Sequence, residues 1–132
     1  MNPQELNTAL VALIQKKQQL SKLDYNDERY DEIAEELHDM EDEFNENYGD
    51  TLEEVLEDVH LKVCPDTDVL LPTAYLPETM NTENGHNPKP SEGVWVEADK
   101  YPNKEARLTL VPNPARIVLT VGKAVQEEVW KA

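Results

Sequence analysis

Apolar residues recur every three or four positions through the first half of the chain, and this spacing predicts helices. Asn2 and Pro3 precede the first apolar stripe and suit a helix N-terminus, because Asn caps free amides and Pro fits the first turn. The two stripes comprise Leu6, Ala9, Leu10, Leu13 and Leu20, and then Tyr30, Ile33, Leu37, Met40 and Phe44. A short connection between them predicts an antiparallel hairpin, and one long helix over residues 3–48 is the alternative.

The boundaries of the later helices follow from capping signals. Asn26 is the expected cap of the second helix, and Gly49 is its expected stop. Thr51 and Glu54 have the spacing of a capping box, so "DTLEEVLEDVHLK" predicts a short third helix that Pro65 ends.

The pattern of apolar and polar residues changes after residue 65. "DVLLPTAYLP" is apolar and interrupted by prolines, which indicates an edge strand or an extended segment. Residues 78–93 are almost without apolar side chains and predict a long loop. Period-two alternation then predicts strands around residues 94–98, 107–110 and 117–121, with turns at "YPNK" and "PNPA". Gly122-Lys123 suits a two-residue hairpin turn, so residues 124–130 are predicted as a last strand, with a short helix as the alternative.

These elements define an α+β fold. An N-terminal antiparallel helical hairpin and a short third helix pack on a C-terminal antiparallel β-meander of three to four strands. A chain of 132 residues has the size of one domain. We expect a single domain over residues 1–132, with a helical part (1–63), an extended segment and long loop (64–92) and a meander (93–132).

The charge is concentrated in one segment. Residues 24–58 hold seventeen acids and one base, whereas the rest of the chain holds eleven of each, so this segment carries the whole net charge of −16. Such a field repels phosphate backbones, which argues against direct binding of nucleic acid, and it attracts basic surfaces or divalent cations.

Nothing in the sequence indicates a membrane or a secretory pathway. The longest apolar run, "ALVALI", is far shorter than the roughly 20 residues of a membrane span, and it lacks the flanks of a signal peptide. One cysteine excludes an internal disulfide. We therefore expect a cytoplasmic protein that does not bind membranes.

Two Glu-x-x-His pairs raise the question of a metal site. Carboxylate and imidazole side chains three residues apart on a helix ligate di-metal centres when they point inward. A helical wheel places Glu35 and His38 on the solvent side of the second stripe, so the pattern favours an exposed face. The metal candidates, all weak, are Glu35, Glu36, His38, Asp39, Glu54, Glu57 and His60.

The run "EELHD" with "EVLE" downstream resembles the spaced carboxylates of the all-α nucleotide pyrophosphohydrolases. The resemblance covers about 23 residues, and the predicted sheet departs from that fold. It implies a magnesium-dependent nucleotide hydrolase that uses the clustered acids to hold Mg²⁺.

Three further residues carry chemistry of their own. Cys64 lies four residues after His60, but no glycine-rich turn accompanies it, so a semi-buried small side chain at an element boundary is favoured over a nucleophile. Alternation places Trp95 on the strand face opposite Val94 and Val96, where it is either exposed or packed against the long loop or the C-terminus, and His86 lies in the long loop. Both are candidate interaction residues.

The favoured interpretation is a non-enzymatic interaction or accessory domain without a cofactor, whose expected partner is a protein, preferably a basic one. A homodimer through the helical hairpin is a further expectation. The alternatives are the magnesium-dependent hydrolase and a DNA mimic, which would need carboxylates spaced like phosphates.

Overall fold

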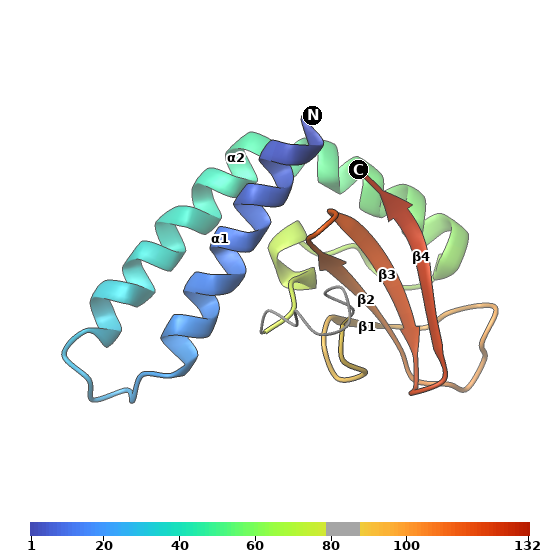
Figure 1. Cartoon of the computed structure of the whole chain (residues 1–132). Coiled ribbons are helices and arrows are strands. Elements are labelled where there is room, and N and C mark those ends of the chain that lie inside the picture. Colours follow the sequence, from blue (N-terminus) through green and yellow to red (C-terminus); the bar gives the residue numbers. More distant parts are fainter. Residues whose placement is uncertain (79–87) are drawn as a thin grey trace.

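Within residues 1–78 and 88–132, which the computed structural model describes, two α-helices precede an antiparallel sheet (Figure 1). The predicted α+β class is confirmed, with a helical hairpin followed by a β-meander. The sheet has the order β1-β2-β3-β4. The elements are α1 (Pro3–Ser21), α2 (Tyr30–Val63), the 3-10 helix η1 (Pro72–Tyr75), β1 (Val94–Val96), β2 (Ala106–Val111), β3 (Arg116–Val121) and β4 (Val125–Lys131).

The start of α1 follows its predicted capping. The Asn2 side chain accepts hydrogen bonds from the backbone N–H groups of Gln4 at 2.9 Å and Glu5 at 3.1 Å, and Pro3 opens the helix. The buried side of α1 consists of Leu6, Leu10, Leu13 and Ile14. The predicted stripe is therefore the face that packs.

The predicted stop at Gly49 and the separate third helix are wrong, because α2 continues without a break from Tyr30 to Val63. A glycine inside a helix costs only about 1 kcal/mol, and burial of apolar residues on both sides of it offsets that cost. Phe44 before Gly49 and Leu52, Leu56 and Val59 after it are all buried. Figure 1 shows that α2 changes direction midway along its length, and Gly49 lies in this middle part of its sequence. Thr51 lies inside the helix and does not cap it.

Asn26 is not the cap of α2, since the helix begins four residues later at Tyr30. The connection folds on itself instead. The Asp27 carboxylate accepts the backbone N–H of Arg29 at 2.8 Å, and the rings of Tyr25 and Tyr30 lie 5.2 Å apart. The Tyr25 ring in the connection therefore packs beside the ring of Tyr30, the first residue of α2.

The sheet is buried more completely than simple alternation predicts. In β3, every residue from Arg116 to Val121 is buried, and in β2 only Arg107 is partly exposed. One face contributes Leu108, Ile117 and Leu119 to the core shared with both helices. The other face is covered in part by the segment that precedes β1, where the Thr109 hydroxyl donates to the Glu92 carbonyl at 3.2 Å.

Residues 125–131 form a strand, which confirms the favoured prediction for this stretch over a helix. Val121 pairs with Val125, so the turn holds three residues rather than the expected two. Gly122 begins it with φ of 53°, a conformation that suits glycine. The segment "DVLLPTAYLP" forms no strand and contains η1.

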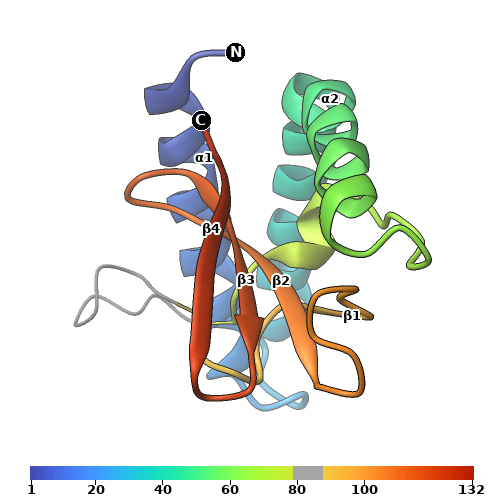
Figure 2. The ribbon, with the colours of Figure 1, turned by 90° about the vertical axis from the view of Figure 1, so that its right-hand side faces the viewer.

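One hydrophobic cluster joins residues of α1, α2, η1 and the sheet. Figure 2 shows α1 behind the strands and α2 beside them, and the second half of α2 leads back toward the sheet. No helix in the described part of the chain is long and apolar enough to cross a membrane.

Candidate functional site

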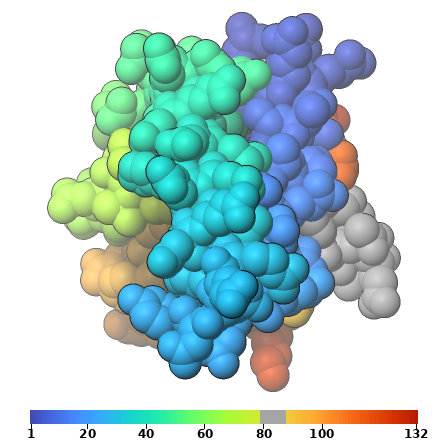
Figure 3. Space-filling view, turned by 90° about the vertical axis from the view of Figure 1, so that its left-hand side faces the viewer, coloured from blue at the N-terminus to red at the C-terminus, as the bar shows by residue number. Residues whose placement is uncertain are grey.

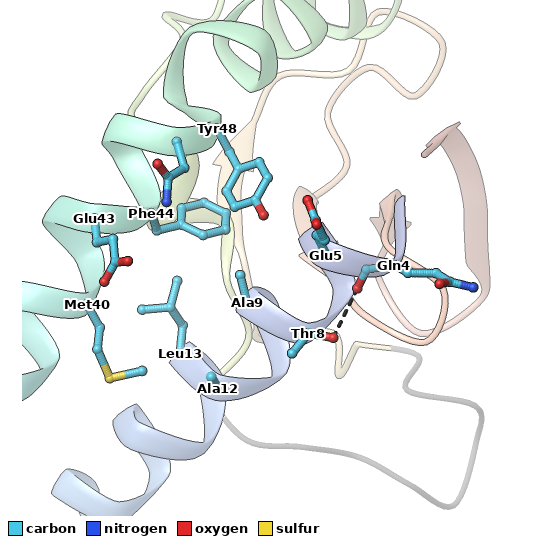
Figure 4. Close-up of a pocket in the computed structure, with 11 residues that line it drawn as sticks. Gln4, Glu5, Thr8, Ala9, Ala12, Leu13, Met40, Glu43, Phe44 and Tyr48 are labelled. Atoms are coloured by element: carbon cyan, nitrogen blue, oxygen red, sulfur yellow. Dashed lines mark hydrogen bonds between the residues drawn. The ribbon is translucent and has the colours of Figure 1, made fainter. Parts of the chain in front are cut away.

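A groove of about 590 Å³ lies between α1 and the first half of α2, and we call it the interhelix groove (Figure 4). Its floor is apolar and its rim is polar. It is lined by Gln4, Glu5, Thr8, Ala9, Ala12, Leu13, Met40, Glu43, Phe44, Asn47 and Tyr48. A cavity of this size is in the usual range of ligand and peptide sites.

The groove exists because small residues on one helix face large residues on the other. Ala9 and Ala12 leave space on α1, and Met40, Phe44 and Tyr48 border that space on α2 (Figure 4). The Phe44 and Tyr48 rings contact each other with centroids 5.2 Å apart. A channel with an apolar floor therefore runs between the two helices.

The rim of the groove is negatively charged. Glu5 stands on α1 and Glu43 on α2 (Figure 4). Neither forms an ion pair with any residue in the described part of the chain. The groove thus combines an apolar floor with two carboxylates that lack a cation.

The α2 side of the groove lies within the acidic segment, residues 24–58. Figure 3 shows this side of the molecule, where α2 and α1 lie next to each other. Of the α2 carboxylates, Glu36 pairs with Lys16 at 2.9 Å and Asp42 pairs with His38 at 3.5 Å. The other α2 carboxylates have no ion pair with the residues that the structure describes.

The predicted metal candidates do not converge. Glu35, Glu36, His38 and Asp39 are exposed on α2, and Glu54 and Glu57 are exposed further along it, whereas His60 is buried. Over residues 1–78 and 88–132, no three His, Cys, Asp or Glu side chains are grouped so as to hold a metal ion. None of the seven candidates lines the interhelix groove.

His60 has a structural environment instead. It is 3% exposed, and its Nδ1 and Nε2 lie 2.9 Å from the Thr67 carbonyl and the Tyr75 hydroxyl, respectively. Because a carbonyl only accepts, Nδ1 carries the proton and Nε2 accepts from Tyr75. The Tyr75 oxygen in turn accepts the Leu70 N–H at 3.0 Å. This chain of hydrogen bonds fastens residues 67–75 to the end of α2.

Cys64 is fully buried rather than semi-buried, and it is not placed for nucleophilic chemistry. Burial raises the pKa of its thiol from 9.0 to about 11, and the nearby Asp99 carboxylate adds to the shift. The ring nitrogens of His60 are engaged with Thr67 and Tyr75. The thiol is therefore protonated at neutral pH and has no activating base there.

Of the two predicted interaction residues, Trp95 is exposed in β1 and lines a second cavity of about 660 Å³. His86 lies outside the described residues. The interhelix groove was not found from the sequence. The sequence feature that reflects the groove is a pair of alanines, Ala9 and Ala12, opposite the larger Met40 and Phe44. This feature indicates a cavity only when the register of the two helices is known.

Comparison with known protein families, with curated proteins and with solved structures gives no match for this chain.

Proposed function

We propose that the protein is a non-enzymatic interaction domain whose interhelix groove accepts a basic amphipathic helix of a partner protein. The observation that carries this proposal is the groove itself, an apolar channel of about 590 Å³ with carboxylates on both sides. Binding a helix in a groove between two helices buries one apolar stripe and leaves the polar side of the ligand at the rim.

The apolar part of the site supplies the affinity. Leu13 and Phe44 form its base, and Met40 adds a flexible side chain that adapts to different partner residues. Leucine or methionine side chains of a ligand helix would bury apolar area there, at about 25 cal/mol per Å².

The charge supplies the selectivity. Glu5 and Glu43 flank the floor, and the adjoining acidic segment, residues 24–58, extends the negative field over α2. Lysine or arginine on the polar face of the ligand would meet carboxylates on both helices. A second copy of this chain would instead bring two acidic helices together, so charge favours a basic partner over a homodimer.

The test uses a synthetic helix of about 16 residues with leucines on one face and lysines on the others, a length of about four to five turns. Two control peptides keep the length: one replaces lysine with glutamate, and the other scrambles the sequence so that the apolar face is lost. We expect the first peptide to bind in calorimetry and to shift the amide signals of residues 4–13 and 40–48. Absent binding, equal binding of the controls, or shifts elsewhere would overturn the proposal.

Variants then locate the site. Ala12→Trp fills the groove, and we expect it to weaken peptide binding at least roughly tenfold, equivalent to about 1.4 kcal/mol. Ala74→Trp makes the same change at an exposed alanine of η1 and should leave binding unchanged. A double variant, Glu5→Gln with Glu43→Gln, should weaken binding more than Glu53→Gln with Glu57→Gln, which removes the same charge farther along α2. If the two double variants weaken peptide binding equally, the carboxylates at the groove rim contribute no more to binding than other carboxylates of α2.

A further inference from the structure

A second cavity, which we call the Trp95 pocket, lies where β1 ends and the connection to β2 begins. Its volume is about 660 Å³. The lining residues that carry chemistry are Trp95, Glu97, Asp99, Tyr101, Lys104 and Glu105. It contains an exposed aromatic ring and three carboxylates, which outnumber the one lysine.

Trp95 is exposed because of its place in β1. Val96 points into the core, so its neighbour Trp95 faces the other way, where it is 52% exposed. Lys100 lies over the ring of Tyr101 at 5.8 Å. Among the described residues no such contact involves Trp95, so its ring face lacks a cation. A large aromatic side chain half open to solvent beside a cavity is typical of a binding anchor.

Two of the carboxylates lack a counter-ion. Glu105 pairs with Arg107 at 3.3 Å, whereas Glu97 and Asp99 form no ion pair within the described part of the chain. The negative charges of Glu97 and Asp99, beside Trp95, are therefore not neutralised by an ion pair with a described residue. A cation entering the pocket would find both an aromatic face and free carboxylates.

The backbone that carries these carboxylates is held in place. The Glu97 N–H donates to the Thr67 hydroxyl at 3.0 Å, and the Asp99 N–H donates to the Val63 carbonyl at 3.0 Å. Both bonds connect the end of β1 to the end of α2 and the segment after it. Groups held in place before binding lose less entropy when a ligand arrives.

We propose that the Trp95 pocket binds an arginine side chain of a protein partner. The flat guanidinium stacks on an indole ring and forms paired hydrogen bonds with a carboxylate at the same time. A lysine ammonium is a point charge that does not match both groups so well. Trp95 would supply the stacking face, and Glu97 and Asp99 would supply the acceptors.

This inference does not rest on the interhelix groove. It involves the end of β1 rather than the hairpin, and its ligand is a single side chain rather than a helix. Either proposal can fail while the other stands.

The test uses a capped pentapeptide, Gly-Gly-Arg-Gly-Gly, with matched peptides in which citrulline or lysine replaces arginine. Citrulline keeps the shape of arginine and removes its charge. In amide-resolved NMR titrations we expect saturable shifts over residues 95–105 with the arginine peptide, and at least roughly tenfold weaker binding of citrulline. Lysine should lie between them. Equal binding of citrulline, or lysine binding as tight as arginine, would overturn the proposal.

Variants assign the roles. Trp95→Leu should abolish the saturable shifts, and Trp95→Phe, which keeps a ring, should retain part of the binding. Glu97→Gln with Asp99→Asn should weaken binding at least roughly fivefold. Asp66→Asn with Asp68→Asn removes the same charge from exposed positions outside the pocket and should change it little. If the two charge variants behave alike, or if Trp95→Phe and Trp95→Leu bind as the parent does, the assignment is wrong.

Discussion

In the helical hairpin formed by α1 and the first half of α2, only one side of each helix is buried, whereas β3 is buried at every position from Arg116 to Val121. The net charge is also uneven: residues 24–58, which hold the connection between the helices and most of α2, carry all of it, and the rest of the chain is neutral. The hairpin thus offers a wide solvent-exposed surface, and the middle of the sheet offers almost none.

This difference shows where each region has room for interaction. The hairpin buries one stripe per helix, so it has space for a groove and for unpaired carboxylates. The sheet is covered on both faces at its centre, so its binding potential is confined to its edge, where Trp95 emerges from β1. The same difference predicts that the two regions respond unequally to mutation.

The largest expected effect is at Gly93, just before β1. Its φ is 96°, and a Cβ there would collide with the Leu108 carbonyl and the Thr109 hydroxyl of β2. Gly93→Ala therefore combines backbone strain with a clash, and we expect it to lower the free energy of unfolding by roughly 3 kcal/mol or more. Urea unfolding followed by circular dichroism measures this.

Gly49 in α2 is the matched control. A Cβ there would meet only the Asn45 side chain at 3.7 Å, an ordinary contact. Gly49→Ala should stabilise the protein by about 0.5–1 kcal/mol, because alanine favours the helix. Opposite signs for the two variants would confirm the contrast between the regions, and destabilisation by both to a similar extent would contradict it.

A smaller loss is expected where α2 meets the segment after it. Tyr75→Phe removes the hydroxyl that links Leu70 and His60, so a partly buried N–H and a buried ring nitrogen lose their partner. The expected cost is roughly 1–3 kcal/mol in the same unfolding assay. Tyr25→Phe makes the same change at a residue that is 80% exposed, and its effect should stay within about 0.5 kcal/mol. Equal effects at both sites would show that the buried hydrogen bonds contribute nothing.

A more gradual effect is expected from ionisation of the Cys64 thiol, which makes the free energy of unfolding depend on pH. Burial raises the folded-state pKa from 9.0 to about 11, so the unfolded chain releases the thiol proton first as pH rises. The contribution to stability is therefore complete below pH 9 and declines between pH 9 and 11. Cys64→Ala should remove this part of the decline, as shown by unfolding free energies of both proteins at several pH values. Parallel curves for the two proteins would contradict the assigned shift.

Much of the fold was readable from local patterns. The stripe of α1, its Asn2 cap and the positions of strands β2 and β3 appear as predicted, because each depends on neighbours three, four or two residues apart, although burial in the two strands does not alternate. The wrong predictions for α2 also come from signals of neighbouring residues. Gly49 and Thr51 carry the signals of a helix end and a helix start, but buried apolar residues on both sides, Phe44 before them and Leu52 after them, keep α2 continuous.

The candidate sites were less accessible to sequence reasoning. Trp95 was a candidate because strand alternation places it opposite Val96, and the structure decides that it is exposed rather than packed against the loop or the C-terminus. The interhelix groove was missed, since Ala9 and Phe44 meet only through the packing of two helices. The conspicuous Glu-x-x-His pairs lead instead to exposed carboxylates and to His60, whose ring is bonded to Thr67 and Tyr75.

The sequence by itself determined the element types, the capped start of α1 and the location of the net charge, because these follow from residue spacing and composition. Only the tertiary structure decided that α2 is one helix, that His60 is a buried link, and that cavities open beside Ala12 and Trp95. These features depend on contacts between residues far apart in the chain, where packing outweighs the preference of any single residue.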